Sequence, residues 1–455
     1  MNTRAPIQER VDGLLRRAGY TDADVAATHQ VMSVLPFRVS NHIVDRLVDW
    51  SAAPDDPIFR LYFPHPDMLR SEPAVDTDPN VIRLQLNPHP GGQLAHNVPR
   101  IDGTTVHGLQ HKYADTVLVF PGRGQTCHAY CAYCFRWAQF VGMPDMQMRM
   151  DDPATMGAYL DAHPEVSNVI LTGGDPFVMG AHVIGPWLAE ASAPHREHLD
   201  VVRIGTKAPL SNPERFVRAN DADALMAALE QVVASGRQLA LMLHVSHARE
   251  LEDPLAQQAI ARLRSTGAML YSQAPLIRHV NDSAEVWRAK WALESRLGIV
   301  PYYMFVERDT GPWRYFAVPL AEAVAAFSMA YGQVGGLSRT VRGPVMSTTV
   351  GKLQVARRTT SDTSNPGNGN TGNGNTGNGN GNGDRNTRNG DGKAGESRDV
   401  GGSWHFTLTF LRARDPAHQG TAFRARSSDT ATWVSELQGV TPADDVLLSA
   451  AAAGG

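Results

Sequence analysis

Between residues 115 and 306, short apolar runs alternate with longer stretches whose apolar residues recur at helical spacing. The runs are DTVLVF (115–120), NVILTG (168–173), VVRIGT (201–206), LALMLHV (239–245), AMLYSQ (268–273) and VPYYMFV (300–306). Nearly continuous apolar runs are typical of strands buried on both faces. Their alternation with helices is typical of repeated βα units around a parallel sheet. The pattern therefore predicts an α/β fold with about six βα units.

The segments between these runs carry their own signals. ADALMAALEQVVASG (222–236), PLAQQAIARLRSTG (254–267) and AEVWRAKWALESRLG (284–298) have helical periodicity, and each finishes on a glycine. Glycine is the residue most often found just beyond a helix C-terminus. We expect a helix in each segment.

The regions before and after the βα units differ from them. We expect residues 1–110 to form a helical N-terminal region, residues 111–346 the βα domain, and residues 347–455 a C-terminal extension. Within the extension, residues 360–402 are a tract of Asn and Gly with almost no apolar side chains, which predicts disorder. The segments on either side of the tract, KLQVA and WHFTLTFLRAR, read as two strands of one small β hairpin, and closing a long loop between them costs little extra entropy.

All three cysteines of the chain lie in one short segment, TCHAYCAYCFRW, directly after the first predicted strand. Cys127, Cys131 and Cys134 have the spacing C-x3-C-x2-C. Three thiolates can hold three irons of a [4Fe-4S] cluster, which leaves the fourth iron open to a ligand. S-adenosylmethionine (SAM) suits this position, because an electron from the cluster cleaves its sulfonium to give the 5'-deoxyadenosyl radical. The spacing predicts a radical SAM enzyme.

The alternative interpretation of the cysteines is a zinc site completed by His128 or His111, since zinc accepts three cysteines and one histidine. Zinc ligands usually occur as two separated pairs, and this segment holds one compact group. The cysteine spacing therefore favours the iron–sulfur cluster.

Composition excludes several classes of function. The chain has 455 residues, 42% of them hydrophobic, and a formal net charge of -4, so a large core is available and no overall positive charge favours nucleic acid. We identified no signal peptide and no apolar run of the roughly 20 residues that span a membrane. We expect a cytoplasmic protein with a small-molecule substrate and no nucleic-acid or membrane partner.

From about Val31 to about Met346, the chain resembles the lysine 2,3-aminomutase family of radical SAM enzymes. The matching stretches, in family order, are VLPFRVSNHI, DDPIFR, HKYADTVL, CHAYCAYCFRW, VILTGGDPF, VVRIGTKAPL, HVSHARELED, SQAPLIRHVND and VPYYMF. The resemblance implies a partial (βα)6 radical SAM barrel with SAM and substrate at the C-terminal ends of its strands, where ligands of α/β folds generally bind.

The resemblance also implies roles for single residues. Gly173, Gly174 and Asp175 would lie beside the amino group of SAM, although taken alone they describe only a tight turn. His244 and Gln273, each ending a predicted strand, are candidates for further SAM contacts or for hydrogen-bonded core groups.

The substrate end of the predicted site departs from the family. Arg136 matches the arginine that binds the α-carboxylate of the substrate. The two aspartates with which the lysine-specific enzymes grip the far ammonium correspond to Arg308 and Arg342. Two buried arginines repel an ammonium and bind a carboxylate or phosphate, so we expect an acidic substrate. In the alternative interpretation, Arg308 pairs with its neighbours Glu307 and Asp309.

Family members use pyridoxal 5'-phosphate (PLP), bound to a lysine that follows a run of glycines. That run is missing here, and the only nearby candidate is Lys352, which is alternatively an exposed residue that opens the strand KLQVA. Lys112 matches a basic position of the phosphate site, whereas an arginine of that site corresponds to Thr116. PLP is therefore a candidate cofactor, and no zinc is expected because the extra cysteines of zinc-binding members are absent.

Three functions compete. The first is a PLP-dependent isomerase, a 2,3-aminomutase acting on a non-lysine amino acid, with flavodoxin or ferredoxin as the electron donor. The second is a PLP-independent radical SAM enzyme acting on another carboxylated metabolite. The third is a non-catalytic cluster-binding protein, which is disfavoured because the cysteines, the Gly-Gly-Asp turn and Arg136 are all present.

Overall fold

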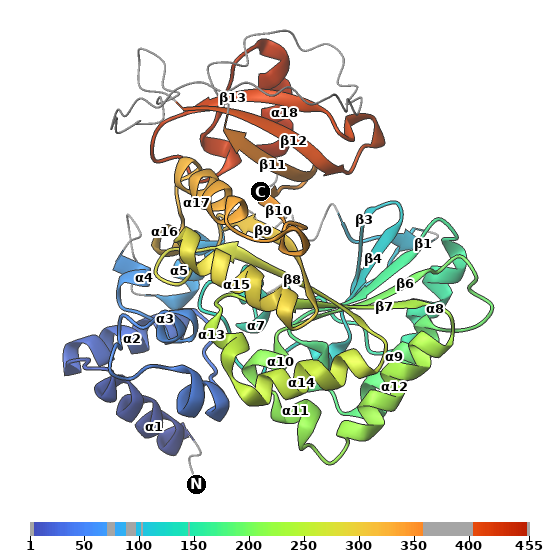
Figure 1. The fold of residues 1–455 in the computed structure, drawn as a ribbon, viewed down its shortest axis with the longest axis horizontal. Coiled ribbons are helices and arrows are strands. Elements are labelled where there is room, and N and C mark those ends of the chain that lie inside the picture. The colour runs from blue at the N-terminus through green and yellow to red at the C-terminus, as the bar shows by residue number, and fades with distance from the viewer. Residues whose placement is uncertain are drawn as a thin grey trace, which may run out of the picture.

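In the computed structural model, the residues described are 4–70, 78–87, 97–101, 103–143, 146–357 and 404–452. They form a mixed α/β fold around one large sheet (Figure 1). The predicted disordered tract at 360–402 lies outside the described residues. None of the described helices is long and apolar enough to cross a membrane.

Seven neighbouring strands of the sheet run parallel to one another. They are β4 (Thr116–Val119), β5 (Asn168–Leu171), β6 (Val201–Thr206), β7 (Gln238–His244), β8 (Met269–Leu276), β9 (Ile299–Val306) and β10 (Arg342–Ser347). The six predicted strands all form, and the α/β class is confirmed. The seventh strand, β10, was missed because its sequence RGPVMS contains Gly-Pro, a pair that sequence rules assign to loops.

Helices connect the parallel strands. They are η2 (Gly122–Gly124), α7 (Trp137–Phe140), α8 (Pro153–Ala162), η3 (Pro176–Val178), α9 (Ala181–Ala191), α10 (Ala208–Ser211), α11 (Glu214–Val217), α12 (Ala222–Ala234), α13 (Arg249–Glu252), α14 (Pro254–Ser265), α15 (Ala284–Arg296), α16 (Trp313–Phe316), α17 (Leu320–Gly332) and η4 (Gly336–Ser338). The predicted helices correspond to α12, α14 and α15, and each ends shortly before its predicted glycine. Asp253 caps α14 by accepting hydrogen bonds from two backbone N–H groups of its first turn.

The main core lies between these strands and the helices that cover them. Its buried side chains include Val117 of β4, Leu171 of β5, Ile204 of β6, Leu241 of β7 and Leu229 of α12. Burial of apolar side chains between a sheet and its covering helices is the main stabilising contribution in such folds. It also fixes the C-terminal ends of the strands, where the predicted site residues lie.

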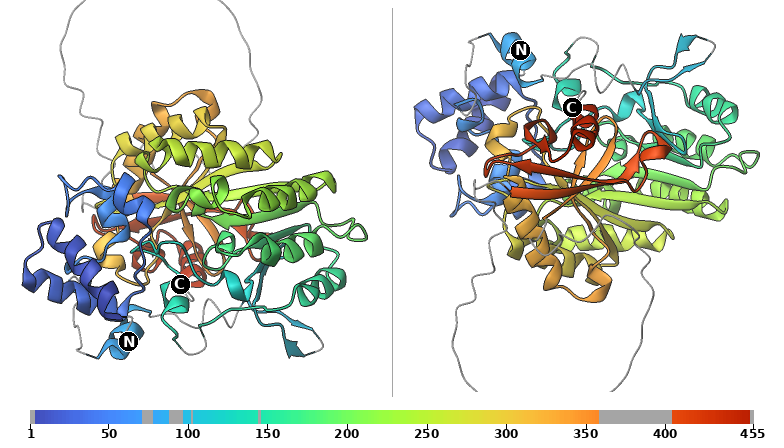
Figure 2. Two further views of the ribbon diagram at one scale, coloured as in Figure 1. Left: turned by 90° about the horizontal axis from the view of Figure 1, so that it is seen from below. Right: turned by 90° about the horizontal axis from the view of Figure 1, so that it is seen from above.

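Among the described residues of the N-terminal region, those up to Leu86 lie mainly in helices and the loops between them. Its helices are α1 (Arg4–Arg17), α2 (Asp22–Val34), the π-helix η1 (Ile43–Leu47), α3 (Pro57–Tyr62), α4 (Asp67–Arg70) and α5 (Pro79–Leu86), and a small antiparallel pair follows, β1 (Arg100–Ile101) with β2 (Thr104–Thr105). Both views of Figure 2 show these helices, in blue, grouped at one end of the molecule. They form a second core that also includes Tyr133, which lies between the second and third cysteines, and Trp137, which follows the third.

Antiparallel strands extend the sheet at both edges. They are β3 (Leu109–Tyr113) beside β4, and β11 (Gly351–Arg357), β12 (Trp404–Ala413), β13 (Ala422–Ser427) and β14 (Gln438–Gly439) beyond β10, with η5 (Pro416–His418), η6 (Val434–Glu436) and α18 (Pro442–Ala452) between or after them. The two predicted hairpin strands do pair, as β11 and β12. The predicted domain limits at 110 and 346 fall inside β3 and β10, so the sheet is continuous across both.

Candidate active site

The three cysteines lie on the loop that leaves the C-terminal end of β4. The backbone of this loop is held by its own turns: the N–H of Cys134 donates to the carbonyl of Cys131 (3.0 Å), and the N–H of Trp137 donates to the carbonyl of Cys134 (2.9 Å). These bonds close two consecutive turns, from Cys131 to Cys134 and from Cys134 to Trp137. We call residues 126–136 the cysteine segment.

Backbone hydrogen bonds connect the cysteine segment to the N-terminal region. The N–H of Tyr130 donates to the carbonyl of Arg38 (2.9 Å), and the N–H of Ala132 donates to the carbonyl of Leu61 (2.9 Å). The Arg38 guanidinium also donates to the carbonyl of Cys127 (3.1 Å). Because these bonds fix the segment from one side, the N-terminal helices belong to the construction of the site.

Burial raises the pKa of all three thiols, to about 11 for Cys131 and about 12 for Cys134. The charges of Asp175 and then of the other two cysteines raise the pKa of Cys127 further, and the charge of Cys131 raises that of Cys134. Because burial and neighbouring negative charges disfavour the thiolate form, a cationic group is needed to stabilise three thiolates in this segment. This donor set fits a [4Fe-4S] cluster, in which each thiolate binds a different iron.

Both histidines of the alternative zinc interpretation have protein partners. His128 shares a hydrogen bond with Asn212 (3.2 Å), and His111 contacts the Tyr159 hydroxyl (2.6 Å) and the carbonyl of Ala114 (3.1 Å). Within the described residues, no group of three or more His, Cys, Asp and Glu side chains is arranged to hold a single metal ion. A cubane does not require such convergence on one point.

The Gly-Gly-Asp turn after β5 packs directly against the cysteine segment. A Cβ on Gly174 would lie 2.2 Å from the carbonyl oxygen of Thr126, and a Cβ on Gly173 would lie 2.1 Å from the Gln125 side chain. The N–H of Asp175 donates to the same Thr126 carbonyl (2.8 Å). Only glycine allows this approach, so the turn has a packing role in addition to any ligand contact.

The carboxylate of Asp175 is buried and strongly hydrogen-bonded within the protein. It accepts from the Thr206 hydroxyl (2.8 Å) and from the backbone N–H groups of Phe177 (3.0 Å), Lys207 (2.8 Å) and Ala208 (2.9 Å). These bonds join the turn after β5 to the end of β6. A SAM contact of Asp175 stays a prediction.

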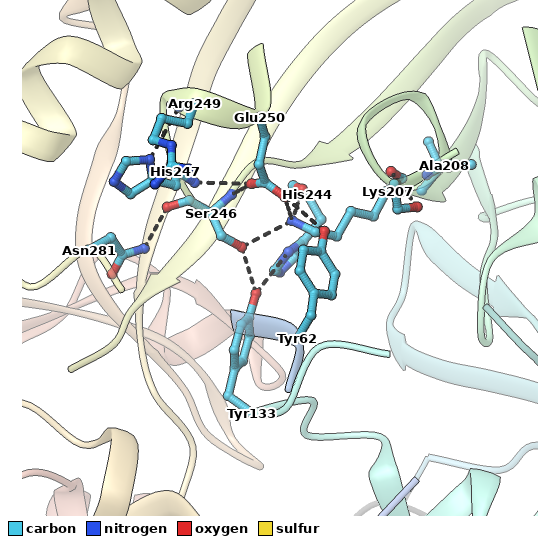
Figure 3. Close-up of polar contacts among 12 residues, drawn as sticks. Tyr62, Tyr133, Lys207, Ala208, His244, Ser246, His247, Arg249, Glu250 and Asn281 are labelled. Atoms are coloured by element: carbon cyan, nitrogen blue, oxygen red, sulfur yellow. Dashed lines mark hydrogen bonds and ion pairs between the residues drawn. The ribbon is translucent and has the colours of Figure 1, made fainter. Parts of the chain in front are cut away.

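His244 and Gln273 end up side by side, because they are register partners on β7 and β8. The His244 ring stacks near Tyr133, and its Nδ1 lies 3.1 Å from the Tyr133 hydroxyl (Figure 3). Burial, with the nearby Lys207 charge, lowers the pKa of His244 well below its usual range. His244 is therefore a neutral imidazole beside the cysteine segment.

Arg136 and Arg308 meet at one aromatic ring. Both guanidiniums lie over Phe135, at 5.0 Å for Arg136 and 5.4 Å for Arg308, and Arg136 also lies 4.8 Å from the Phe120 ring. Burial, together with the charge of Arg308, lowers the pKa of Arg136 to about 10. Two desolvated cations this close form a strong attraction for an anion.

Two acidic residues, Glu307 and Asp309, flank Arg308 in the sequence. The carboxylates of Asp309 and Glu307 both favour the charged form of Arg308. Burial nevertheless raises the pKa of Glu307 well above its usual range. Glu307 is therefore largely protonated, and it neutralises Arg308 only in part.

The prediction that Arg342 is buried is wrong. Arg342 is exposed at the beginning of β10, opposite Tyr303 of β9, and it donates to the Tyr303 hydroxyl at 3.4 Å. The cysteine segment and Arg308 follow the C-terminal ends of their strands, so Arg342 lies away from them along the sheet. The site was predicted at the C-terminal ends of the strands, and Arg342 is the first residue of β10, a strand that the sequence did not predict.

Lys112 and Lys352, predicted from opposite ends of the domain, come together. Lys352 is paired with Ser347 at the turn from β10 to β11, and Lys112 on β3 donates to the carbonyl of Thr348 in that turn. Both ammonium groups lie near the Tyr113 ring, at 5.1 Å for Lys352 and 5.4 Å for Lys112. The alternative that Lys352 is exposed is wrong, because its side chain is half-buried.

The lowered pKa values of these two lysines are those expected of a site that binds an anion. Burial, followed by the charge of Lys352, lowers the pKa of Lys112 to about 6. Burial, followed by the charge of Arg203, lowers the pKa of Lys352 to about 8. A bound phosphate would favour the charged form of Lys112, and a lysine with a pKa near 8 is partly neutral and nucleophilic at neutral pH.

Sequence reasoning missed a guanidinium beside this site. Arg412 of β12 lies 3.2 Å from the Thr116 hydroxyl, pairs with Asp115 and covers the Tyr113 ring at 4.4 Å. The residue is separated from the lysines by the Asn/Gly tract, so no local pattern connects them. The only available signal was the strand-like run WHFTLTFLRAR, which carries the arginine at its end.

Comparison with known proteins agrees with the resemblance. The chain is 31% identical over 322 residues to a putative L-lysine 2,3-aminomutase of Aquifex aeolicus, which covers 70% of this chain and 77% of that protein. It is 29% identical over 297 residues to the L-lysine 2,3-aminomutase of Escherichia coli, covering 65% of this chain and 76% of that protein.

No family model matches the chain. Among solved structures, a radical SAM methyltransferase from Sphaerobacter thermophilus aligns with a TM-score of 0.34 and 18% identity, over 52% of this chain and 68% of that one, which is too low to support an argument. The sequence relationship extends over most of both chains. The chain therefore belongs to the lysine 2,3-aminomutase family.

Proposed function

We propose that this protein is a radical SAM enzyme in which Cys127, Cys131 and Cys134 hold a [4Fe-4S] cluster. Once bound, the cluster supplies the electron that cleaves SAM to the 5'-deoxyadenosyl radical. The buried thiols and their mutual repulsion support this donor set. The parallel strands would form the partial (βα)6 barrel of such enzymes.

The SAM site would lie at the C-terminal ends of β5, β7 and β8. Gly173 and Gly174 offer backbone carbonyls to the SAM ammonium, and their lack of side chains keeps them close to the cysteine segment. His244 and Gln273 are register partners on β7 and β8. Because His244 is neutral, it can accept or donate a hydrogen bond without repelling the sulfonium.

The substrate is an amino acid with an acidic side chain, and the reaction is a 2,3-amino shift. The observation that carries this proposal is the pair of guanidiniums of Arg136 and Arg308 over Phe135, next to Cys134. One arginine would bind the α-carboxylate and the other the distal carboxylate, each by two parallel hydrogen bonds. A lysine ammonium would instead face two cations.

Lys352 and Lys112 fit PLP, with Lys352 forming the covalent link and Lys112 facing the phosphate. Bound PLP would carry the migrating amine as an imine. Burial keeps Lys352 partly neutral at neutral pH, which favours attack on an aldehyde. Burial and the neighbouring charges lower the pKa of Lys112 to about 6, so a bound phosphate would favour its charged form and gain a cationic partner.

The other features of the proposal follow from the family. A cytoplasmic flavodoxin or ferredoxin would reduce the cluster, and the enzyme would act in the cytoplasm on a small molecule. The test is anaerobic reconstitution with iron and sulfide, followed by reduction with SAM and measurement of 5'-deoxyadenosine with aspartate, glutamate or lysine, with and without PLP. Absence of 5'-deoxyadenosine under every condition would refute the proposal.

The acidic-substrate proposal has its own test. Arg308→Asp replaces a half-buried guanidinium by the opposite charge, and we expect it to weaken binding of the acidic substrate by about 100-fold, as loss of one partner of a desolvated charge pair does. Arg342→Ala is the matched control, because this arginine is exposed. Lysine turnover by the wild type comparable to turnover of an acidic amino acid would contradict the proposal.

A further inference from the structure

A buried polar network joins the loop after β7 to the cysteine segment (Figure 3). Tyr133 lies between the second and third cysteines, and its hydroxyl contacts Ser246 Oγ at 2.9 Å and His244 Nδ1 at 3.1 Å. Ser246 is fully buried, and its carbonyl accepts from the Asn281 side chain at 2.9 Å. Tyr133 is therefore hydrogen-bonded to the buried loop after β7.

The ammonium of Lys207 forms hydrogen bonds with both His244 and Ser246, the two residues that contact the Tyr133 hydroxyl. It donates to Ser246 Oγ (3.1 Å) and to the carbonyl of His244 (3.0 Å), and it forms an ion pair with Glu250 at 2.7 Å. One lysine therefore connects three groups around the hydroxyl of Tyr133.

Glu250 completes the network from the other side. Its carboxylate has no solvent exposure, and it accepts from the backbone N–H groups of Ser246 (2.7 Å) and His247 (3.0 Å) and from the Tyr62 hydroxyl (2.9 Å). Tyr62 belongs to α3 of the N-terminal region. The network thus spans the two parts of the chain that enclose the cysteine segment.

Lys207 reaches the other end of the cysteine segment through its backbone. Its N–H donates to the Asp175 carboxylate (2.8 Å), and the N–H of Asp175 donates to the carbonyl of Thr126, the residue before Cys127. The same residue therefore fixes the segment before its first cysteine and between its second and third.

We propose that Lys207 and Glu250 are positioning residues that hold the three cysteines in the geometry of the cluster, and that the Lys207 charge favours the reduced cluster. The inference rests on the proposed function, because it assigns the cluster to these cysteines. The inference goes beyond the proposed function because it assigns control of the cluster to a buried ion pair that contacts neither substrate nor iron. Removing a nearby positive charge disfavours the state with the more negative charge, so the reduction potential should fall.

The first test uses the full-length protein without iron. In Lys207→Met/Glu250→Gln, which keeps the charges balanced, we expect hydrogen exchange of peptides covering 127–136 to accelerate by at least about tenfold, as lost hydrogen bonds allow local opening. The matched control is Lys290→Met/Glu294→Gln, which removes another fully buried Lys–Glu pair, 3.1 Å apart on α15, and should leave this exchange unchanged. Equal exchange in the wild type and the first variant would overturn the proposal.

The second test measures the midpoint potential of the reconstituted cluster. Lys207→Met should lower the potential, and Lys207→Arg should restore it, because arginine keeps the charge and the donors. An unchanged potential in Lys207→Met would overturn the electrostatic part of the proposal. If the double variant does not fold, Tyr133→Phe removes only the hydroxyl that joins the segment to the network and should give the same faster exchange. A wild type that takes up no iron would refute the proposed function, whereas the exchange experiment would still decide the positioning role.

Discussion

Replacement of Lys352 by methionine should stabilise the protein without ligand. Burial lowers the pKa of this ammonium from 10.5 to about 8, so below pH 8 the folded protein carries a charge that the unfolded chain accommodates more easily. At about 1.4 kcal/mol per pH unit, the penalty is about 3 kcal/mol. Lys352→Met has nearly the same length and removes the charge, so the free energy of unfolding at pH 7 should rise by up to that amount.

The stability difference between Lys352→Met and the wild type should depend on pH in a definite direction. Between pH 8 and 10.5 the unfolded chain binds more protons at this lysine than the folded protein, so the stability of the wild type rises with pH over that window. The advantage of Lys352→Met should therefore be constant below pH 8 and should disappear by about pH 10.5. Loss of the Lys352 charge also relieves the repulsion that lowers the pKa of Lys112.

Urea denaturation of the metal-free protein, followed by fluorescence at several pH values, measures this difference. Lys352→Arg is the control, because it retains a charge that stays protonated over the whole range and should not stabilise the protein. A Lys352→Met variant that is less stable than the wild type at pH 7, or whose advantage does not shrink between pH 8 and 10.5, would refute the reasoning. Stabilisation by loss of a charged residue is typical of functional sites.

Further predictions concern the cysteine segment. Gly174→Ala would place a Cβ 2.2 Å from the Thr126 carbonyl oxygen, so we expect thermal denaturation to show a loss of stability of about 2 kcal/mol or more, and reconstitution to yield less bound iron. The control is Gly185→Ala on α9, which has open space at its Cβ position and should be neutral or slightly stabilising in the same denaturation experiment. Cys134→Ser should leave the fold intact and abolish the visible absorbance of the cluster, and iron uptake equal to the wild type would contradict the assignment. Asp175→Asn should reduce stability by about 1–3 kcal/mol, because an amide cannot satisfy all the donors that meet the carboxylate, and unchanged denaturation midpoints would argue against its packing role.

Local features of the sequence were sufficient to predict the βα units. Apolar runs such as NVILTG become strands because a strand buried on both faces needs continuous apolar residues. The position of Cys127, Cys131 and Cys134 on one loop followed from their spacing, since residues this close in sequence must lie close in space. The Gly-Gly-Asp turn after β5 was also evident, although the close approach that requires its glycines was not.

Only the tertiary structure decided which distant residues share the site. β3 and β4 lie far from β10, β11 and β12 in the strand order, so the sheet has to curve to bring Lys112 to the turn that carries Lys352, and Arg412 to Thr116. The same strand order leaves Arg342 exposed at the far end of β10.

The network of Lys207, Glu250 and Tyr133 likewise depends on how β6, β7 and the cysteine segment pack. Sequence patterns report the environment of a residue within its own element, because periodicity and spacing are local. Contacts between elements depend on the order, direction and register of strands, and these are set by the free energy of the whole packed chain. The sequence alone therefore determined the cysteine loop and the strands that carry it, and the packed sheet decided which charges surround them.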